Sequence, residues 1–148
     1  MQSFEPRDPD WQTRVRLSAA RQAFMIALGV ELGDMAPGAI DLVLPYREDL
    51  TQQHGFFHAG ATTTIADSAA GYAALSLFPP GTGVLTTEFK MNLLNPGRGE
   101  RLVACGRVIK PGRTLTVCKS DVYGLTAEHR VHVATGLYSM ICLEGLDD

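Results

Sequence analysis

Two hydrophobic periods run along this chain, and they predict different elements. The first is a spacing of four in the stretch 58–77, which is typical of a helix with an apolar face. Its members are Ala61, Ile65, Ala69, Ala73 and Leu77. Further alanines occupy neighbouring positions, so few sites remain for a solvated face. We therefore expect a long helix that is covered on most sides.

The second period is the alternation of two that strands show. Before the long helix, the segment 39–45 places Ile40, Leu42 and Leu44 on one face. After the helix, turns that contain Pro and Gly separate four strand segments: 83–94, 101–109, 114–123 and 130–143. The last segment is expected to have one apolar face, made of Val131, Val133, Leu137, Ile141 and Leu143. Short turns between consecutive segments predict an antiparallel meander.

The N-terminal part has a helical pattern from residue 11 to residue 28, ended by Gly29 or Gly33. Its expected apolar stripe is Leu17, Ala20, Phe24 and Leu28, with Arg14, Arg16 and Arg21 on a solvated face. The order helix, strand, long helix and four strands predicts one α+β domain over residues 1–148, with 1–33 as an N-terminal helical segment. An antiparallel sheet wrapped around the long helix covers one side of it. We expect a second copy of the chain to cover the other side.

The composition narrows the classes of function. A net charge of -3 and the lack of a basic stripe argue against nucleic-acid binding. The sequence shows no signal-peptide pattern and no apolar run of transmembrane length, which predicts a cytoplasmic protein with no membrane partner. Its three widely spaced cysteines are expected to be reduced core residues. His54 and His58 are four residues apart, but no third ligand is near them, so we expect no metal and no other cofactor.

Asp67 is the strongest candidate for chemistry. It is the only formally charged residue between Asp49 and Glu88, and it lies inside the predicted helix, where Asp is disfavoured. A buried carboxylate needs a partner or a use. The hydroxyl groups of Thr63, Thr64 or Ser68 offer a structural partner, whereas a catalytic or substrate-facing role is the interpretation that we favour.

The start of the same helix offers a second reactive group. Free backbone N–H groups at a helix start can bind a developing oxyanion, and here the helix opens with His58-Ala59-Gly60. Gly60 lets a substrate approach the backbone closely. An oxyanion site together with a carboxylate that acts as nucleophile or general base suits acyl transfer to water.

These residues resemble the hotdog-fold acyl-CoA thioesterases of the phenylacetate-degradation type, called PaaI. In that family a His-Gly-Gly triplet opens the central helix and an acid follows, as His58-Ala59-Gly60 and Asp67 do here. The Asn or Gln that the family has six residues before the histidine falls on Gln52. Further matches are Thr86, Pro96 and the pair Gly112-Arg113. The resemblance covers residue 39 to the C-terminus, and Ala59 departs from the family's usual glycine.

The resemblance implies an acyl-CoA substrate and hydrolysis of its thioester. The N–H of Ala59 would polarise the carbonyl, with Gly60 beside it, and Asp67 would attack the carbonyl or activate a water. Gln52 would position the water or the acyl group. His58 would fix the loop or, more simply, cap the helix.

Other residues have both a functional and a structural interpretation. Thr86 would hold the water or be an ordinary strand residue. Arg113, with Lys110, would meet CoA phosphates or be a plain hairpin charge. The aromatic side chains would line an acyl pocket or belong to the core; they are Phe56, Phe57 and Tyr72.

Helix geometry and the resemblance both place the site between subunits. At about 1.5 Å per residue, Ala59 and Asp67 are roughly 12 Å apart along the helix axis, too far to meet one thioester. Two antiparallel helices related by a two-fold axis bring the start of each beside the middle of the other. We expect a homodimer or homotetramer with sites at the dimer interface.

Two rival functions stay open. A hotdog hydratase or dehydratase would share the fold, but such enzymes pair their acid with a histidine at a spacing that this chain lacks. A non-catalytic acyl-CoA-binding homo-oligomer would keep the pocket and Arg113 without needing an ionised Asp67. The sequence does not choose between an aromatic and a medium-chain acyl group.

Overall fold

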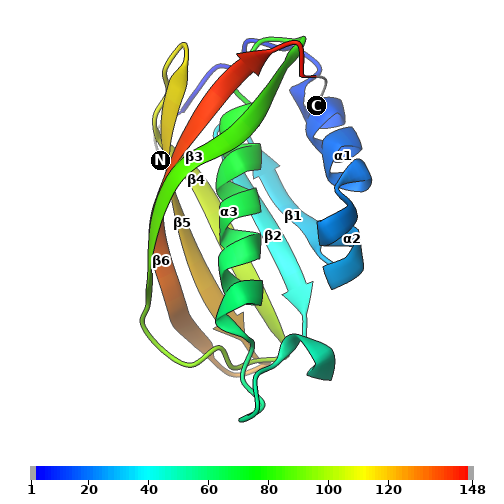
Figure 1. Cartoon of the computed structure of the whole chain (residues 1–148), viewed down its shortest axis with the longest axis vertical. Coiled ribbons are helices and arrows are strands. Elements are labelled where there is room, and N and C mark those ends of the chain that lie inside the picture. Colours follow the sequence, from blue (N-terminus) through cyan, green and yellow to red (C-terminus); the bar gives the residue numbers. More distant parts are fainter. Residues whose placement is uncertain (1–2, 147–148) are drawn as a thin grey trace.

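A six-stranded antiparallel sheet curls around one long helix, α3, in the computed structural model, which describes residues 3–146 (Figure 1). The helices are α1 (Trp11–Arg21), α2 (Ala23–Leu28) and α3 (Ala59–Leu75), with a 3-10 turn at Glu48–Leu50. The strands are β1 (Glu31–Ala36), β2 (Ala39–Pro45), β3 (Thr82–Leu93), β4 (Arg101–Lys110), β5 (Leu115–Leu125) and β6 (Arg130–Glu144). The predicted α+β architecture, a sheet wrapped around a long helix, is confirmed.

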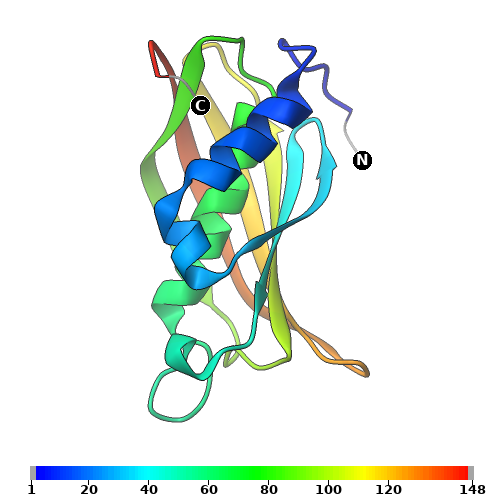
Figure 2. The ribbon, with the colours of Figure 1, turned by 90° about the vertical axis from the view of Figure 1, so that its right-hand side faces the viewer.

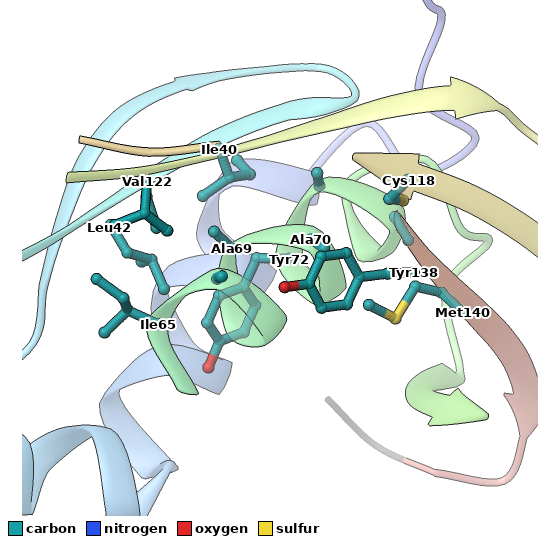
Figure 3. Packing of buried hydrophobic residues seen from close by; sticks show 14 of the residues in the cluster. Ile40, Leu42, Ile65, Ala69, Ala70, Tyr72, Cys118, Val122, Tyr138 and Met140 are labelled. Atoms are coloured by element: carbon teal, nitrogen blue, oxygen red, sulfur yellow. The ribbon is translucent and has the colours of Figure 1, made fainter. Parts of the chain in front are cut away.

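The apolar face predicted for α3 is its buried face. All five predicted positions are buried, and Ile65, Ala69 and Ala73 are fully so, although Leu77 lies beyond the end of α3 at Leu75. Figure 3 shows Ile65 and Ala69 among the strand residues Ile40 and Leu42, with which they share one hydrophobic cluster. The spacing of four therefore identified the core of this molecule correctly.

Small residues let α3 lie very close to the sheet. Gly106 on β4 faces Ser120 on β5, which in turn faces Gly136 on β6, so a row of small side chains crosses the middle of the sheet. A Cβ added at Gly106 would overlap the carbonyl oxygen of Ala69 and lie 2.7 Å from the nitrogen of Ala70. The backbone of α3 therefore rests directly on β4 at this point.

The predicted meander is wrong for two of the strands. The sheet order is β1-β2-β4-β5-β6-β3, so β3 pairs with β6 and β4 pairs with β2. Only β4, β5 and β6 follow one another as neighbours. Local turn signals mark where a strand ends, but α3 carries the chain across the sheet, and β3 then joins the far edge.

The face predicted for β6 is also wrong, because Val133 alone of its five residues is buried. Val122 pairs with Ala134 while Tyr123 pairs with His132, so Val133 is an extra residue in β6. An extra residue moves every later side chain to the opposite face. Consequently Leu137 is 54% exposed, whereas Tyr138 and Met140 fill the core.

The predicted N-terminal helix is two helices. Gln22 has an extended backbone (φ -76°, ψ 93°) and separates α1 from α2, which lie across one flank of α3 (Figure 2). The predicted stripe is wrong, because Leu17 is 57% and Phe24 is 59% exposed, while Trp11 and Val15 are buried. Both faces of this segment carry apolar residues, so spacing alone did not choose between them. Strand β1 was not predicted, because at the sheet edge its residues are exposed or half-buried and form no apolar alternation.

Arg14 corrects the expectation of a solvated arginine face. Its guanidinium lies 3.4 Å from the Asp8 carboxylate, and 9% of each side chain is exposed. It also donates to the carbonyl oxygens of Phe78 and Pro79, at 3.2 and 2.9 Å. Arg14 thus fixes α1 to the turn between α3 and β3.

No helix within residues 3–146 is long and apolar enough to cross a membrane. The three cysteines are free: Cys118 is buried, and Cys105 and Cys142 are half-buried. Burial raises the pKa of the Cys118 thiol to about 12, which makes it an inert core residue rather than a nucleophile.

The contact between α3 and β4 predicts a large effect of one added methyl group. Gly106→Ala should lower the free energy of unfolding by about 3 kcal/mol, because a side chain there overlaps helix backbone that cannot rotate away. Ala104→Gly, on the same face of β4, removes a methyl group and should cost only about 1 kcal/mol. Urea denaturation of both variants and the wild type measures these changes in the free energy of unfolding. Equal midpoints for Gly106→Ala and the wild type would contradict the close approach.

Candidate active site

Asp67 lies on the flank of α3 that the sheet leaves partly uncovered. The hydroxyl of Thr86 on β3 donates to its Oδ1 at 2.7 Å. No Lys, Arg or His side chain of the described chain forms an ion pair with it. Burial raises the pKa of Asp67 above its usual value of 3.8, and the Thr86 hydrogen bond opposes that rise. Such an unpaired carboxylate is more basic than a surface aspartate.

A cavity of about 260 Å³ opens beside this carboxylate. Helix α3 forms one wall and the start of β3 forms the opposite wall. The lining residues are Gln22, Asp67, Ser68, Gly71, Tyr72, Val84, Leu85 and Thr86. Thr63, Thr64 and Ser68, the structural partners considered for Asp67, make no hydrogen bond to it in residues 3–146; Thr86 does.

The start of α3 is capped by its own histidine. His58 is the N-cap residue, and its Nδ1 accepts a hydrogen bond from the N–H of Gly60 at 2.8 Å. A Cβ at Gly60 would lie 2.9 Å from that nitrogen, so glycine leaves room for the cap. Of the two interpretations of His58, the structure supports the helix cap.

The cap leaves the amide of Ala59 available. Ala59 is the first helical residue and is exposed, and no acceptor for its N–H occurs among residues 3–146. The N–H of Gly60 is already bonded to His58, and that of Ala61 belongs to a buried residue, so within residues 3–146 Ala59 offers the exposed free donor at this end of the helix. The methyl group of Ala59 does not alter this donor.

Gln52 lies in the loop that leads to the helix. Its side-chain oxygen accepts a hydrogen bond from the backbone N–H of His54, and its own N–H donates to Phe56 at 2.9 Å. Gln52 and Ala59 line a second cavity of about 390 Å³, which Phe56, Phe57 and residues 93–97 also line. Gln52 and Ala59 are therefore brought together, as expected.

The two cavities have no residue in common. Gln52 and Ala59 belong to one, whereas Asp67 and Thr86 belong to the other. Helix rise separates Ala59 from Asp67 by roughly 12 Å along the axis of α3. The chain thus places its candidate oxyanion donor and its candidate carboxylate in separate places.

Strand β3 is an edge strand with uncovered apolar side chains. Phe89 pairs with Tyr138 and Leu93 pairs with Ala134, both of which are buried, so these side chains lie on the helix side of the sheet. Even so, Phe89 is 48% and Leu93 is 56% exposed. The strip between β3 and α3 is therefore apolar and open in the single chain.

The remaining predicted residues lie apart from Asp67. Arg113 is exposed between β4 and β5, and its role stays a prediction. Phe57 is buried in the core and Phe56 is stacked under Arg98, 4.4 Å from its guanidinium carbon. Among residues 3–146, no three His, Cys, Asp or Glu side chains lie close enough together to hold a metal ion.

Sequence reasoning missed three residues near Asp67. Gln22 comes from the break between α1 and α2, and Gly71 follows Asp67 by one helical turn. The hydroxyl of Tyr138 is buried without a hydrogen-bond partner among the described residues, and the charge of Asp67 adds to burial in raising its pKa. A glycine inside an otherwise strong helix was the one available signal.

Comparison with known proteins shows which family this chain is similar to. Residues 54–126 match the Thioesterase superfamily. A crystal structure of a thioesterase family protein from Silicibacter pomeroyi superimposes with a TM-score of 0.89 at 45% identity, covering 91% of this chain and 99% of that one. The PaaI protein of the E. coli phenylacetic acid degradation operon has a TM-score of 0.82 at 19% identity, covering 94% of this chain and 97% of that one, and so shares the fold.

Curated relatives agree with this placement. Human acyl-coenzyme A thioesterase 13 is 26% identical over 107 residues, which cover 72% of this chain and 76% of that protein. A Halobacterium salinarum protein with a provisional esterase name is 34% identical over 100 residues, or 64% of this chain. The chain spans just under two thirds of that relative, 66% of its length. Its fold and its similarity to the Silicibacter protein over almost all of that chain show that this protein is a hotdog-fold member of the thioesterase superfamily.

Proposed function

We propose that this protein hydrolyses an acyl-CoA thioester to the free acid and CoA, with Asp67 as the reacting carboxylate. The observation that carries the proposal is the environment of Asp67: a cavity wall, no cationic partner, one hydroxyl donor and a raised pKa. A carboxylate in this environment lowers the stability of the folded protein, which is expected of a group that serves as a base or nucleophile. The acyl-CoA substrate is carried over from the related acyl-coenzyme A thioesterase.

The proposed reaction needs three roles. The N–H of Ala59 donates to the thioester carbonyl oxygen and stabilises the negative charge that develops on it. Asp67 either attacks the carbonyl carbon or removes a proton from the water that does. If Asp67 attacks, the C–S bond breaks to leave an acyl–Asp67 anhydride, which water then hydrolyses to the free acid and the Asp67 carboxylate. If Asp67 acts as a base, the water oxygen bonds to the acyl carbon as the C–S bond breaks. On either route the departing CoA sulfur takes up the proton that the water loses, and CoA leaves as its thiol. The third role is positioning: Thr86 holds the carboxylate in place through its hydrogen bond, and Gln52 positions the water or the acyl group.

A second copy of the chain completes the proposed site. The separation of Ala59 from Asp67 prevents one helix from serving one carbonyl. The open apolar strip between α3 and β3 offers a surface for an antiparallel partner helix. In this homodimer Gln52, His58 and Ala59 of one protomer face Asp67 of the other, and the cavity beside Asp67 is closed.

A panel of acyl-CoA substrates tests the reaction class. Thiol release from aromatic and medium-chain acyl-CoA supports the hydrolase. Binding without release supports the acyl-CoA-binding alternative, and a change in acyl unsaturation supports a hydratase. The family placement favours hydrolysis among these three outcomes.

Asp67→Asn should abolish most turnover and keep the fold. The amide is nearly the same size, and general-base or nucleophilic catalysis contributes about 10²-fold or more to kcat. Because burial raises the pKa of Asp67, its ionisation makes the folded state less favourable as pH rises through that pKa. The variant should therefore unfold at pH 7 at a temperature equal to or above that of the wild type. Normal turnover would show that Asp67 is structural.

Thr86→Val should move the acid limb of the pH–rate profile to higher pH. The Thr86 hydrogen bond lowers the pKa of Asp67, so its loss leaves the effect of burial unopposed. Since the carboxylate is the active form, activity then falls away at a higher pH on acidification. Thr87→Val is the matched control, because the Thr87 hydroxyl donates to Ser139 instead. If the acid limb lies at the same pH in both variants as in the wild type, Asp67 is not the group whose ionisation the reaction requires.

Mixing two inactive variants tests whether the site is shared. Asp67→Asn and Gln52→Ala are unfolded together and refolded. With random pairing about half of the dimers are mixed and carry one intact site, so about a quarter of wild-type activity should return. If both groups belonged to a site within one chain, no mixed dimer would hold a complete site. A mixture that stays inactive, while wild type refolded in parallel recovers, contradicts the shared site.

A further inference from the structure

The proposed hydrolysis uses Asp67 and Thr86 but not the part of their cavity that lies beyond them. Gly71 and Tyr72 follow Asp67 on α3, and Gln22 reaches the cavity from the break between α1 and α2. Tyr72 lies five residues after Asp67, or about 7.5 Å further along the helix axis. The cavity therefore extends away from the carboxylate toward the N-terminal helices.

Gly71 has no structural reason to be a glycine within the described chain. Glycine inside a helix costs about 1 kcal/mol relative to alanine. A Cβ at Gly71 would meet only the Cγ1 of Val84, at 4.0 Å, which is an ordinary contact. Gly106, by contrast, has no room for any side chain. Since Gly71 is four residues after Asp67, its missing side chain leaves space beside the carboxylate.

Gln22 and Tyr72 form a polar pair beyond Gly71. The Tyr72 hydroxyl donates to the side-chain oxygen of Gln22 at 2.8 Å. The side-chain amide of Gln22 has a carbonyl oxygen and an NH₂ group. The oxygen accepts from Tyr72, and the NH₂ group can donate to another molecule. No acceptor for the Gln22 amide nitrogen occurs in residues 3–146.

We infer that Gly71 and Gln22 determine which acyl group this protein accepts. Gly71 leaves room for the acyl group next to Asp67, and the Gln22 amide binds a hydrogen-bonding oxygen at the far end of that group. The favoured substrate class is a short acyl-CoA with a polar end. A cavity of about 150 Å³ accepts benzene, so 260 Å³ suits an acyl group of roughly one ring or six carbons. This inference rests on the proposed function.

A purely structural role for the pair makes a different prediction. If the bond between Gln22 and Tyr72 only holds the helix break against α3, its loss lowers stability and affects every substrate alike. A specificity role changes the ratio between two substrates that differ only at their far end. The ratio is therefore the decisive measurement.

The first experiment compares hexanoyl-CoA with 6-hydroxyhexanoyl-CoA by thiol release. The wild type should prefer the hydroxylated substrate in kcat/KM by roughly fivefold, the effect of about one neutral hydrogen bond. Gln22→Leu should remove this preference. Gln12→Leu, the same change at an exposed position of α1 away from the cavity, should keep it. An unchanged preference in Gln22→Leu overturns the role of Gln22.

The second experiment uses Gly71→Ala, which should fold at least as stably as the wild type. Its kcat/KM for hexanoyl-CoA should fall about tenfold or more, because one added methyl group has an effect of this size in a close-fitting pocket. Its kcat/KM for acetyl-CoA, which has a smaller acyl group, should fall less. Size-exclusion chromatography checks that assembly is unchanged. Equal effects on both substrates, or no effect on either, overturn the role of Gly71.

Binding measurements separate this inference from the proposed function. Analogues of both hexanoyl substrates, with CH₂ in place of the thioester sulfur, bind without hydrolysis and are followed by calorimetry. If the wild type releases no thiol, hydrolysis is wrong, yet Gln22→Leu must still lose the preference for the hydroxylated analogue. Failure of the wild type to bind either analogue overturns the acyl site.

Discussion

The close contact between the backbone of α3 and the middle of the sheet is the constraint on which the rest of this structure depends. Gly106 has no side chain, and the alanines of α3 present almost no bulk, so helix and strand backbones meet directly. A small gap in this packing would forfeit much of the dispersion energy. The contact fixes the rotation of α3 about its axis, and this rotation directs Asp67 toward β3 rather than into the core.

The position of Asp67 follows from how little of α3 one sheet can cover. Strands β2, β4 and β5 cover the alanine face, while β3 lies at the edge and leaves the adjoining strip open. Asp67 is therefore buried enough to raise its pKa and open enough to reach a cavity. Full burial would make the carboxylate prohibitively costly, and full exposure would give it an ordinary pKa.

The helix cap leaves an exposed backbone donor at the start of α3. His58 accepts the N–H of Gly60 and Ala61 is buried, so among the described residues the N–H of Ala59 is the exposed donor that a ligand could reach. Its distance from Asp67 makes a single chain an incomplete catalyst under the proposed mechanism. In the proposed homodimer, function and assembly are linked, because the apolar strip offered to the partner helix borders the cavity beside Asp67.

Sequence by itself determined the elements that rest on local periodicity and on residue type. The buried face of α3 and strand β2 were readable, since spacing is a local signal. Asp67 and the 58–60 segment were singled out by an isolated charge and a helix start, which are also local signals, and their catalytic roles stay predictions. Tertiary structure alone decided the pairing of β3 with β6, the reversal of face at Val133, and the break at Gln22. These features depend on contacts between segments far apart in the chain, such as Gln22 with Tyr72, and no local pattern encodes the energy of such contacts.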